Sequence, residues 1–222
     1  CPHWMRYLER VQPNPETRRI IQLMFGLALV PDTRYEVAFL LFGEGGTGKS
    51  VLLHVLTHLV GVENVCNIPL SRFGSRFGLE GLTTCLLNIV GDMPTAGDVT
   101  SIGTIEGAFK DVCSGGMIPV EKKFENLYMA RAIARNIFAT NSLPTFSDSS
   151  NAIWSRLRII PFNEMIRGTG EDNKNLKNEL LEELPGVFNW AVAGLKELRT
   201  LPLFPECPEG EVLKSAHRED CD

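Results

Sequence analysis

A glycine-rich loop between two apolar runs constrains the fold of this chain more than any other feature. Residues 37–42, VAFLLF, form a continuous apolar run, which is typical of a strand buried on both faces of a parallel sheet. The next eight residues, GEGGTGKS, have the pattern G-x-x-x-x-G-K-[ST], and the residues that follow have the apolar spacing of a helix. A strand, such a loop and a helix in this order predict a site for the phosphates of a nucleotide.

Each residue type in this loop has a chemical reason to be there. Glycines let backbone N–H groups curl around phosphate oxygens, because no Cβ stands in the way. Lys49 can reach the β and γ phosphates, and the Ser50 hydroxyl can ligate Mg²⁺. The predicted nucleotide-binding residues are Gly43, Gly45, Gly46, Thr47, Gly48, Lys49 and Ser50.

The bulk composition limits the classes of protein that need to be considered. A chain of 222 residues, 44% of them hydrophobic, can bury one α/β core with a small helical appendage. No apolar run approaches the ~20 residues that span a bilayer, so we expect no membrane contact and a cytoplasmic location. Six scattered cysteines without a C-x-x-C pair argue against a zinc site and favour a reducing compartment. The start at Cys1 and the charged end lead us to expect a piece of a longer protein.

The net charge of −5 is unevenly distributed along the chain. Residues 164–222 hold 13 acidic and 7 basic side chains, a net of −6, whereas residues 1–163 hold 14 acidic and 15 basic ones, a net of +1. The acidity therefore belongs to the C-terminal part, and the rest of the chain can still present a basic surface to a nucleic acid.

Strand-like and helix-like stretches alternate along the chain, which predicts a parallel sheet flanked by helices on both faces. Strands are expected at 84–90, 136–140 and 157–162, helices at 15–29 and 102–112, and a hairpin at 117–122 and 127–129. We expect the helix from Pro15 to form a lid before the core. The expected organisation is an N-terminal helical segment at 1–35, a core at 36–165 and an acidic helical segment at 166–222.

Three polar side chains at strand ends complete the predicted site. Asp92 follows the apolar run LLNIVG, where a carboxylate could hold the metal; its neighbour is Gly91 rather than a second acid, so the general base is not identified. Asn141 follows the strand at 136–140 and either senses the γ-phosphate or caps the turn before Pro144. Arg156 and Arg158 surround a strand start. Such a pair usually marks a solvated strand face, but in a ring one Arg can reach the neighbouring subunit's site.

These motifs together carry a family resemblance over about residues 10 to 200. The chain resembles the superfamily three helicases, and most of all the phage, plasmid and large-virus primase-helicases of the poxvirus type, through GEGGTGKS, LLNIVGD, SGGMIPVEKKF, IFATNSLP and SRLRIIPF. The resemblance implies an AAA+-like core, ATP hydrolysis with Mg²⁺, a hexameric ring around single-stranded DNA, 3′-to-5′ translocation and an upstream primase domain. It gives Lys49 and Ser50 the Walker A roles, Asp92 the metal role, Asn141 the sensor role and Arg156 the arginine-finger role.

The hairpin segment VEKKFEN departs from the family pattern. Relatives carry a Lys-His pair that grips DNA in the channel, and the matching pair here looks like Lys123-Phe124. Lys can pair with a phosphate, while Phe can pack on a base or sugar. The alternative is a solvated, charged hairpin whose Phe fills a local crevice.

Three function classes remain open on the sequence. The first is an ATP-dependent DNA helicase domain that acts in the replication of a phage, plasmid or virus. A P-loop phosphotransferase would explain Lys49 and Ser50, but it gives no role to the sensor and the Arg that follows it. A nucleotide-dependent scaffold that assembles on DNA without unwinding it is compatible with Gly91 in place of a second acid.

Overall fold

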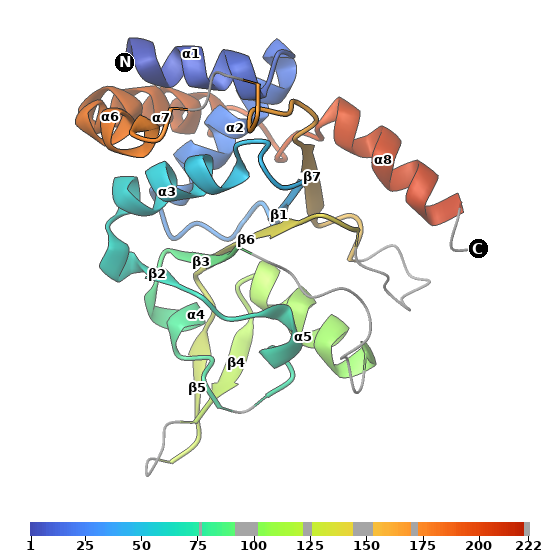
Figure 1. The fold of residues 1–222 in the computed structure, drawn as a ribbon. Helices are drawn as coiled ribbons and strands as arrows, with labels where there is room; N and C mark the ends of the chain where they lie inside the picture. The colour runs from blue at the N-terminus through green and yellow to red at the C-terminus, as the bar shows by residue number, and fades with distance from the viewer. Residues whose placement is uncertain (76, 92–101, 122–125, 144–152, 170–172, 220–222) are drawn as a thin grey trace.

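A parallel five-stranded sheet forms the centre of the computed structural model, which describes residues 1–75, 77–91, 102–121, 126–143, 153–169 and 173–219 (Figure 1). The strand order is β2-β3-β6-β1-β7, and every pair of neighbours is parallel. The strands are β1 (Ala38–Phe42), β2 (Val65–Cys66), β3 (Leu87–Val90), β6 (Arg135–Thr140) and β7 (Leu157–Pro161). The expected class, α/β with a parallel sheet flanked by helices, is confirmed.

The sheet is buried on both faces, as its continuous apolar strands predict. All residues of β6 and β7 are buried, and in β1 only Phe42 is partly exposed. Successive residues of a strand point to opposite faces, so they join two different clusters of buried side chains. Phe39, Leu41, Ile137 and Ile160 belong to the first cluster, and Ala38, Leu40, Phe138 and Ile159 to the second.

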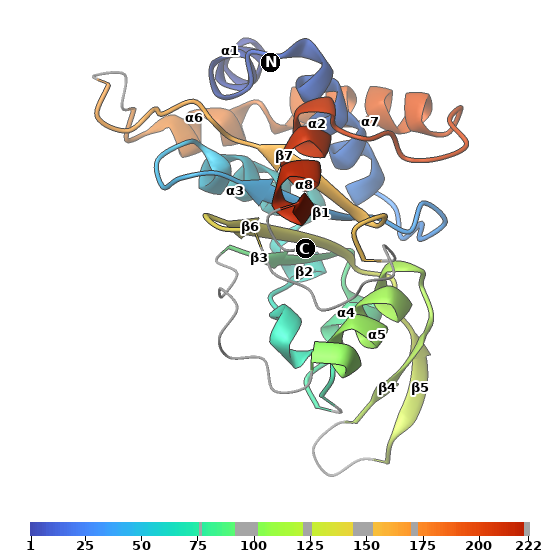
Figure 2. The ribbon, with the colours of Figure 1, turned by 90° about the vertical axis from the view of Figure 1, so that its right-hand side faces the viewer.

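Helices from both ends of the chain, together with the helix after β1, cover the first face (Figures 1 and 2). They are α1 (Pro2–Val11), α2 (Pro15–Ala28), α3 (Lys49–Val60), α6 (Leu176–Glu182) and α7 (Leu184–Leu198). The start of α2 is confirmed: Asn14 is its N-cap and accepts a hydrogen bond from the Glu16 backbone N–H at 2.9 Å, with Pro15 at the first helical position.

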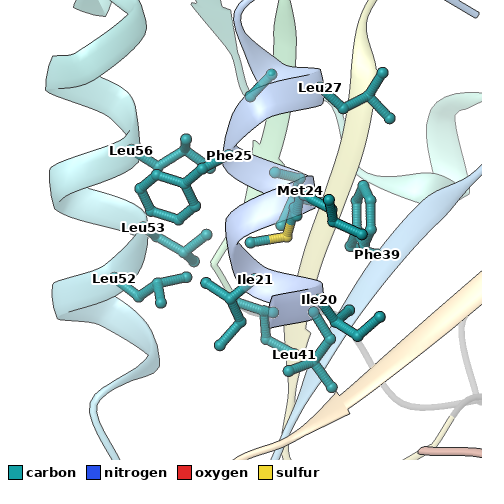
Figure 3. Packing of buried hydrophobic residues seen from close by; sticks show 14 of the residues in the cluster. Ile20, Ile21, Met24, Phe25, Leu27, Phe39, Leu41, Leu52, Leu53 and Leu56 are labelled. Carbon is teal, nitrogen blue, oxygen red and sulfur yellow. The ribbon is translucent and has the colours of Figure 1, made fainter. Parts of the chain in front are cut away.

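The expectation that α2 forms a lid is wrong, because this helix is part of the core. Ile21 and Phe25 of α2 point toward α3, whereas Ile20 and Met24 lie on the side of β1 (Figure 3). All four side chains are buried. A helix with this much apolar surface inside the core cannot swing away from the sheet without exposing it to water.

The second face carries the 3₁₀ turn η2 (Leu70–Arg72), the helices α4 (Gly81–Thr84) and α5 (Ile102–Cys113), and an antiparallel ribbon of β4 (Met117–Val120) and β5 (Tyr128–Arg131). The 3₁₀ turn η1 (Val62–Asn64) connects α3 to β2. The helix expected at 102–112 and the hairpin are therefore confirmed. The strand expected from residue 84 begins only at Leu87, because 81–84 are helical.

The C-terminal helix α8 (Pro208–Glu219) packs against the edge strand β7 (Figure 2). A Cβ at Gly210 would lie 1.9 Å from the Ile159 carbonyl oxygen, so α8 approaches β7 at backbone distance. In the described ranges of the chain, no helix is both long enough and apolar enough to cross a membrane.

Two glycines allow α2 and α7 to cross in close contact. A Cβ at Gly26 would lie 2.4 Å from the Leu195 backbone nitrogen, and one at Gly194 would lie 2.4 Å from the Gln22 carbonyl oxygen. Neither distance leaves room for a methyl group, and both neighbours are backbone atoms that cannot rotate away. The packing of the terminal helices therefore requires glycine at both positions.

Gly194→Ala should destabilise the protein by about 1–3 kcal/mol, because the added methyl group forces the two helices apart. The measurement is the free energy of unfolding from urea titration followed by circular dichroism. Gly107→Ala is the matched control, since Gly107 lies in α5 and a Cβ there would meet nothing within 4 Å. That variant should be stabilised by about 0.4–1 kcal/mol through the lost freedom of the unfolded chain. Equal stability of the two variants would contradict the close crossing.

Candidate nucleotide-binding site

The predicted phosphate loop lies between the carboxyl end of β1 and the start of α3. Gly43 must be glycine for space, because a Cβ there would lie 2.2 Å from the Phe162 carbonyl oxygen. Gly48 is the N-cap of α3, with φ +99°, a region that glycine adopts without strain. The loop therefore leads the chain into the N-terminus of a twelve-residue helix, whose partial positive charge favours an anion.

The polar side chains of the loop have distinct surroundings. The Lys49 ammonium donates hydrogen bonds to the carbonyl oxygens of Gly43 and Glu44, so its side chain folds back over the loop. Thr47 is buried, and its hydroxyl donates to the Glu44 carbonyl oxygen at 2.8 Å. Ser50 is exposed in the first turn of α3. Lys49 and Ser50 thus lie together in the first turn of α3 beside the loop, whereas the Thr47 side chain stabilises the loop.

A cleft of about 910 Å³ opens beside this loop, and its lining is strongly basic. It runs between α1, the residues Gly46, Gly48 and Ser50, and residues 166–167 and 173–179. Among the lining residues that the structure describes, one side chain is acidic, Glu179, and five are those of Arg or Lys: Arg6, Arg10, Arg167, Lys174 and Lys177. Apolar side chains complete the wall: Val11, Val51, Ile166 and Leu176. A cleft with this charge and partly apolar walls can take a polyanion that carries a ring system.

The helix α1 holds the loop in place through a buried phenol. Tyr7 donates a hydrogen bond to the Gly48 carbonyl oxygen at 2.9 Å. Burial raises the pKa of Tyr7 well above its ordinary value, so the phenol stays protonated and remains a donor. Gln12, just after α1, donates to the Pro161 carbonyl oxygen at 2.7 Å. The N-terminal helix is therefore part of the site, and it fixes both the loop and the end of β7.

The segment after β7 is attached to the loop from the other side. The backbone N–H groups of Ile166 and Arg167 both donate to the Gly46 carbonyl oxygen, at 3.0 and 3.1 Å. Arg10 links α1 to this segment, through Glu164 at 3.5 Å and the Met165 carbonyl oxygen. The loop is thus enclosed between an N-terminal helix and a C-terminal segment.

Sequence reasoning missed these two walls of the cleft, although α1 leaves a readable signal. Its buried residues Trp4, Tyr7, Leu8 and Val11 have helical spacing, and Arg6 and Arg10 share the face toward the cleft. The segment around Arg167 leaves no such signal, because its place depends on where β7 ends.

The predicted sensor lies beside the loop. The Thr140 carbonyl oxygen, at the end of β6, accepts a hydrogen bond from the Gly43 backbone N–H at 3.1 Å, and Thr140 pairs with Phe42. Asn141 follows directly and is exposed. Asp92, the predicted metal ligand, lies outside the described residues, and so do Lys123 and Phe124 of the hairpin.

Arg156 lies at the amino edge of the sheet, where the parallel strands begin, whereas the loop lies at the carboxyl edge, where they end. The Arg156 carbonyl oxygen accepts a hydrogen bond from the Ala38 backbone N–H at 2.9 Å, at the amino end of β1. The five residues of β1 separate it from the loop by roughly 15 Å at about 3.3 Å per residue. The structure therefore does not bring Arg156 together with Lys49 of the same chain.

The alternative of a solvated strand face around Arg156 and Arg158 is wrong for Arg158. This guanidinium is buried and donates to the carbonyl oxygens of Ser155 at 2.7 Å and Phe204 at 3.2 Å, and it forms an ion pair with Glu206 at 3.0 Å. Burial lowers the pKa of Arg158, and Glu206 and Glu211 offset part of that effect. Arg158 attaches the C-terminal segment to β7.

Similarity to known proteins agrees with this architecture. The chain is 25% identical over 202 residues to the protein "Putative helicase L207/L206" of Acanthamoeba polyphaga mimivirus, in an alignment that covers 86% of this chain and 20% of the viral protein. The structure "The apo structure of NrS-1 C terminal region (305-718)" is similar with a TM-score of 0.68 at 16% identity, over 88% of this chain and 48% of that chain. "The A form apo structure of NrS-1 C terminal region-CTR" has a TM-score of 0.63 at 16% identity, over 85% and 45%. At this identity the likeness shows the fold alone.

This chain thus spans about a fifth of the viral protein and about half of each solved chain. Its residues 41–156 match a family of unknown function, DUF5906. Since the match includes the phosphate loop, Asn141 and Arg156 and covers more than half of the 222 residues, the protein belongs to DUF5906.

Proposed function

We propose that this chain is the ATP-hydrolysing domain of a DNA helicase that translocates on single-stranded DNA during replication of a phage, plasmid or virus. The observation that carries the proposal is the phosphate loop at the N-terminus of α3, with Lys49 folded over it and a basic cleft beside it. The helicase name of the mimivirus relative and the family resemblance of the motifs support it.

The residues present fit a nucleoside triphosphate. The loop leads into the N-terminus of α3, whose partial positive charge favours an anion, and the bases Arg6, Arg10 and Arg167 oppose the negative charge of a polyphosphate. Lys49 would hold the transferring phosphate, while Ser50 and Asp92 would hold Mg²⁺ and Asn141 would contact the γ-phosphate. Bound ATP supplies the phosphoanhydride bond, and the protein supplies positioning and charge.

The proposal includes a ring of identical subunits, six by family resemblance. Arg156 lies at the amino edge of the sheet, too far to reach the loop of its own chain. In a head-to-tail ring, one edge of each subunit can face the opposite edge of the next. We therefore assign Arg156 to the site of the neighbouring subunit.

Three further parts of the proposal concern the whole protein. We propose a primase domain upstream of this chain, action in the cytoplasm of the host cell, and the division into segments 1–35, 36–165 and 166–222. The mimivirus relative is about five times the length that this chain covers, which leaves room for such a domain.

The decisive experiment is ATP hydrolysis with and without single-stranded DNA. Turnover should require Mg²⁺ and rise with DNA, and Lys49→Ala should abolish it, because losing a preorganised charge at the phosphates costs on the order of several kcal/mol in the transition state. Asp92→Asn should keep much of the nucleotide binding but lose Mg²⁺-dependent turnover. Phosphorylation of a small molecule would instead favour a phosphotransferase, and an absence of turnover would favour a scaffold. Wild-type rates in Asp92→Asn would remove its metal role.

The second experiment tests Arg156 in mixed rings. Arg156→Ala should lower kcat by about 10³-fold or more, the usual contribution of an arginine finger. When it is mixed equally with Lys49→Ala, about a quarter of the sites in randomly assembled rings should combine an intact loop with an intact finger, and activity should return. A mixture of Lys49→Ala and Asp92→Asn is the control, because neither subunit has an intact nucleotide site. Rings that assemble but never regain activity would refute the assignment in trans.

The third experiment tests the hairpin residues by a salt titration of single-stranded DNA binding. Lys123→Ala should reduce the slope of log affinity against log salt by about 0.7, since one phosphate contact is lost. Phe124→Ala should weaken binding by ~1–3 kcal/mol while leaving the slope unchanged, because stacking releases no counterions. Lys196→Ala, an exposed base on α7, controls for the loss of one charge elsewhere. Wild-type binding by both hairpin variants at every salt concentration would move the DNA contact to other bases, such as Arg72, Arg76 or Lys110.

A further inference from the structure

A strained turn lies next to Arg156 at the amino edge of the sheet. The Glu36 backbone N–H donates to the Thr33 carbonyl oxygen at 3.0 Å, which closes the turn before β1. Glu36 has φ +47° and is the one non-glycine residue with positive φ in the part of the chain that the structure describes. A side chain in this region is disfavoured, and such residues persist where the surrounding structure holds them.

The turn is held from two sides by the core. The buried Arg135 guanidinium donates to the carbonyl oxygens of Asp32 and Val37, one on each side of the turn. Thr33 packs on the connection between α5 and β4, where a Cβ at Gly115 would lie 2.3 Å from the Thr33 hydroxyl oxygen. The position of Glu36 is therefore fixed by contacts that do not depend on its own side chain.

The Glu36 side chain fixes the orientation of Arg156. A Glu36 carboxylate oxygen lies 2.6 Å from the Arg156 Nη2 atom. The Arg156 carbonyl oxygen accepts a hydrogen bond from the backbone N–H of Ala38, two residues after Glu36. The segment 36–38 thus contacts both the backbone and the guanidinium of Arg156. The Arg156 side chain is 23% exposed, so it is only partly covered by its own chain.

Stability is a weak reason for this pair. The Glu36 side chain is 47% exposed, and ion pairs at such exposure add little to folding. A strained backbone at Glu36 costs free energy that an exposed ion pair of this kind does not offset. The turn and its rigid support are well suited to holding a guanidinium in one orientation, since a catalytic charge acts best when it is already in place.

We propose that Glu36 is a positioning residue for Arg156, which it holds oriented toward the neighbouring subunit's phosphate loop. The inference rests on the proposed function and adds a residue to it. Glu36 itself contacts no substrate, so its effect must pass entirely through Arg156 and must appear in the site of the neighbour.

The test uses Glu36→Gly and Glu36→Gln in the full chain. Glycine adopts φ +47° without strain, so the first variant keeps the turn and removes the carboxylate. Glutamine keeps the side-chain length and an oxygen that can accept from the guanidinium. We expect kcat of Glu36→Gly to fall by about 10- to 100-fold with little change in the KM for ATP, as for a misplaced catalytic group. Glu36→Gln should lie between this variant and the wild type.

The readout that separates positioning from a structural role is the mixed ring. Glu36→Gly subunits should regain activity when mixed with Lys49→Ala subunits, because their own loops are intact and the neighbour's finger is correctly held. Glu197→Ala is the matched control: it breaks an exposed pair with Arg19 on α2 and α7, and it should hydrolyse ATP like the wild type. Urea unfolding of each variant confirms that the fold is intact.

Three results would overturn the inference alone. The first is wild-type ATP turnover in both Glu36 variants. The second is turnover faster than that of the wild type, which would mean that the pair restrains Arg156. The third is a loss of turnover in Glu36→Gly that mixing with Lys49→Ala does not restore, although the same mixing restores Arg156→Ala. If mixing also fails for Arg156→Ala, the assignment of Arg156 in trans is wrong and this inference falls with it.

Discussion

The parallel pairing of β1 between β6 and β7 is the constraint on which the rest of the structure depends. Its register aligns Phe42 with Thr140 and Pro161, so the phosphate loop, Asn141 and the segment after β7 all leave the sheet at one edge. The same pairing places Arg156 and Glu36 at the other edge. Because parallel strands share one direction, groups that follow strands and groups that precede them are separated by the full length of the sheet. The proposed site, which combines Lys49 with Arg156, would therefore take its Arg156 from a second molecule.

The first and last helices are part of this arrangement. Both α2 and α7 pack on the first face of the sheet, and they cross at the distance that Gly26 and Gly194 allow. Above them, α1 reaches the loop through Tyr7. The sequence shows that 15–29 is helical and apolar on one side, but its partners are set by the tertiary fold: they include α3 and β1 and also α7, which lies more than 150 positions away. Interpretation of α2 as a lid failed for this reason: local periodicity gives a helix and its apolar face, and long-range packing decides what covers that face.

In the candidate site, too, local sequence predicts some features and long-range packing decides the others. Lys49 and Ser50 could be placed from sequence because the loop pattern, the strand before it and the helix after it are contiguous. Asn141 and Arg156 could be placed relative to strand ends, since an apolar run fixes where a strand begins and stops. Arg158 could not, because its burial comes from the segment around Phe204 and Glu206, which returns to β7 from far along the chain. Whether an Arg in a strand is buried or solvated depends on the segment that packs over it. The residues of the strand itself do not show which segment that is.

The charge distribution has a structural explanation that the net charge conceals. The acidic C-terminal part supplies Arg167, Lys174 and Lys177 to the basic cleft, while several of its acids bind other elements. Glu183 accepts hydrogen bonds from the backbone N–H groups at the start of α1, Glu197 pairs with Arg19, and Glu206 pairs with Arg158. These carboxylates lie at contacts between elements, where their partners compensate part of their charge. Three bases of the same part of the chain line the cleft. A chain with a net charge of −5 can therefore present a positive field at its phosphate loop, because field strength follows the local arrangement of charges rather than their sum.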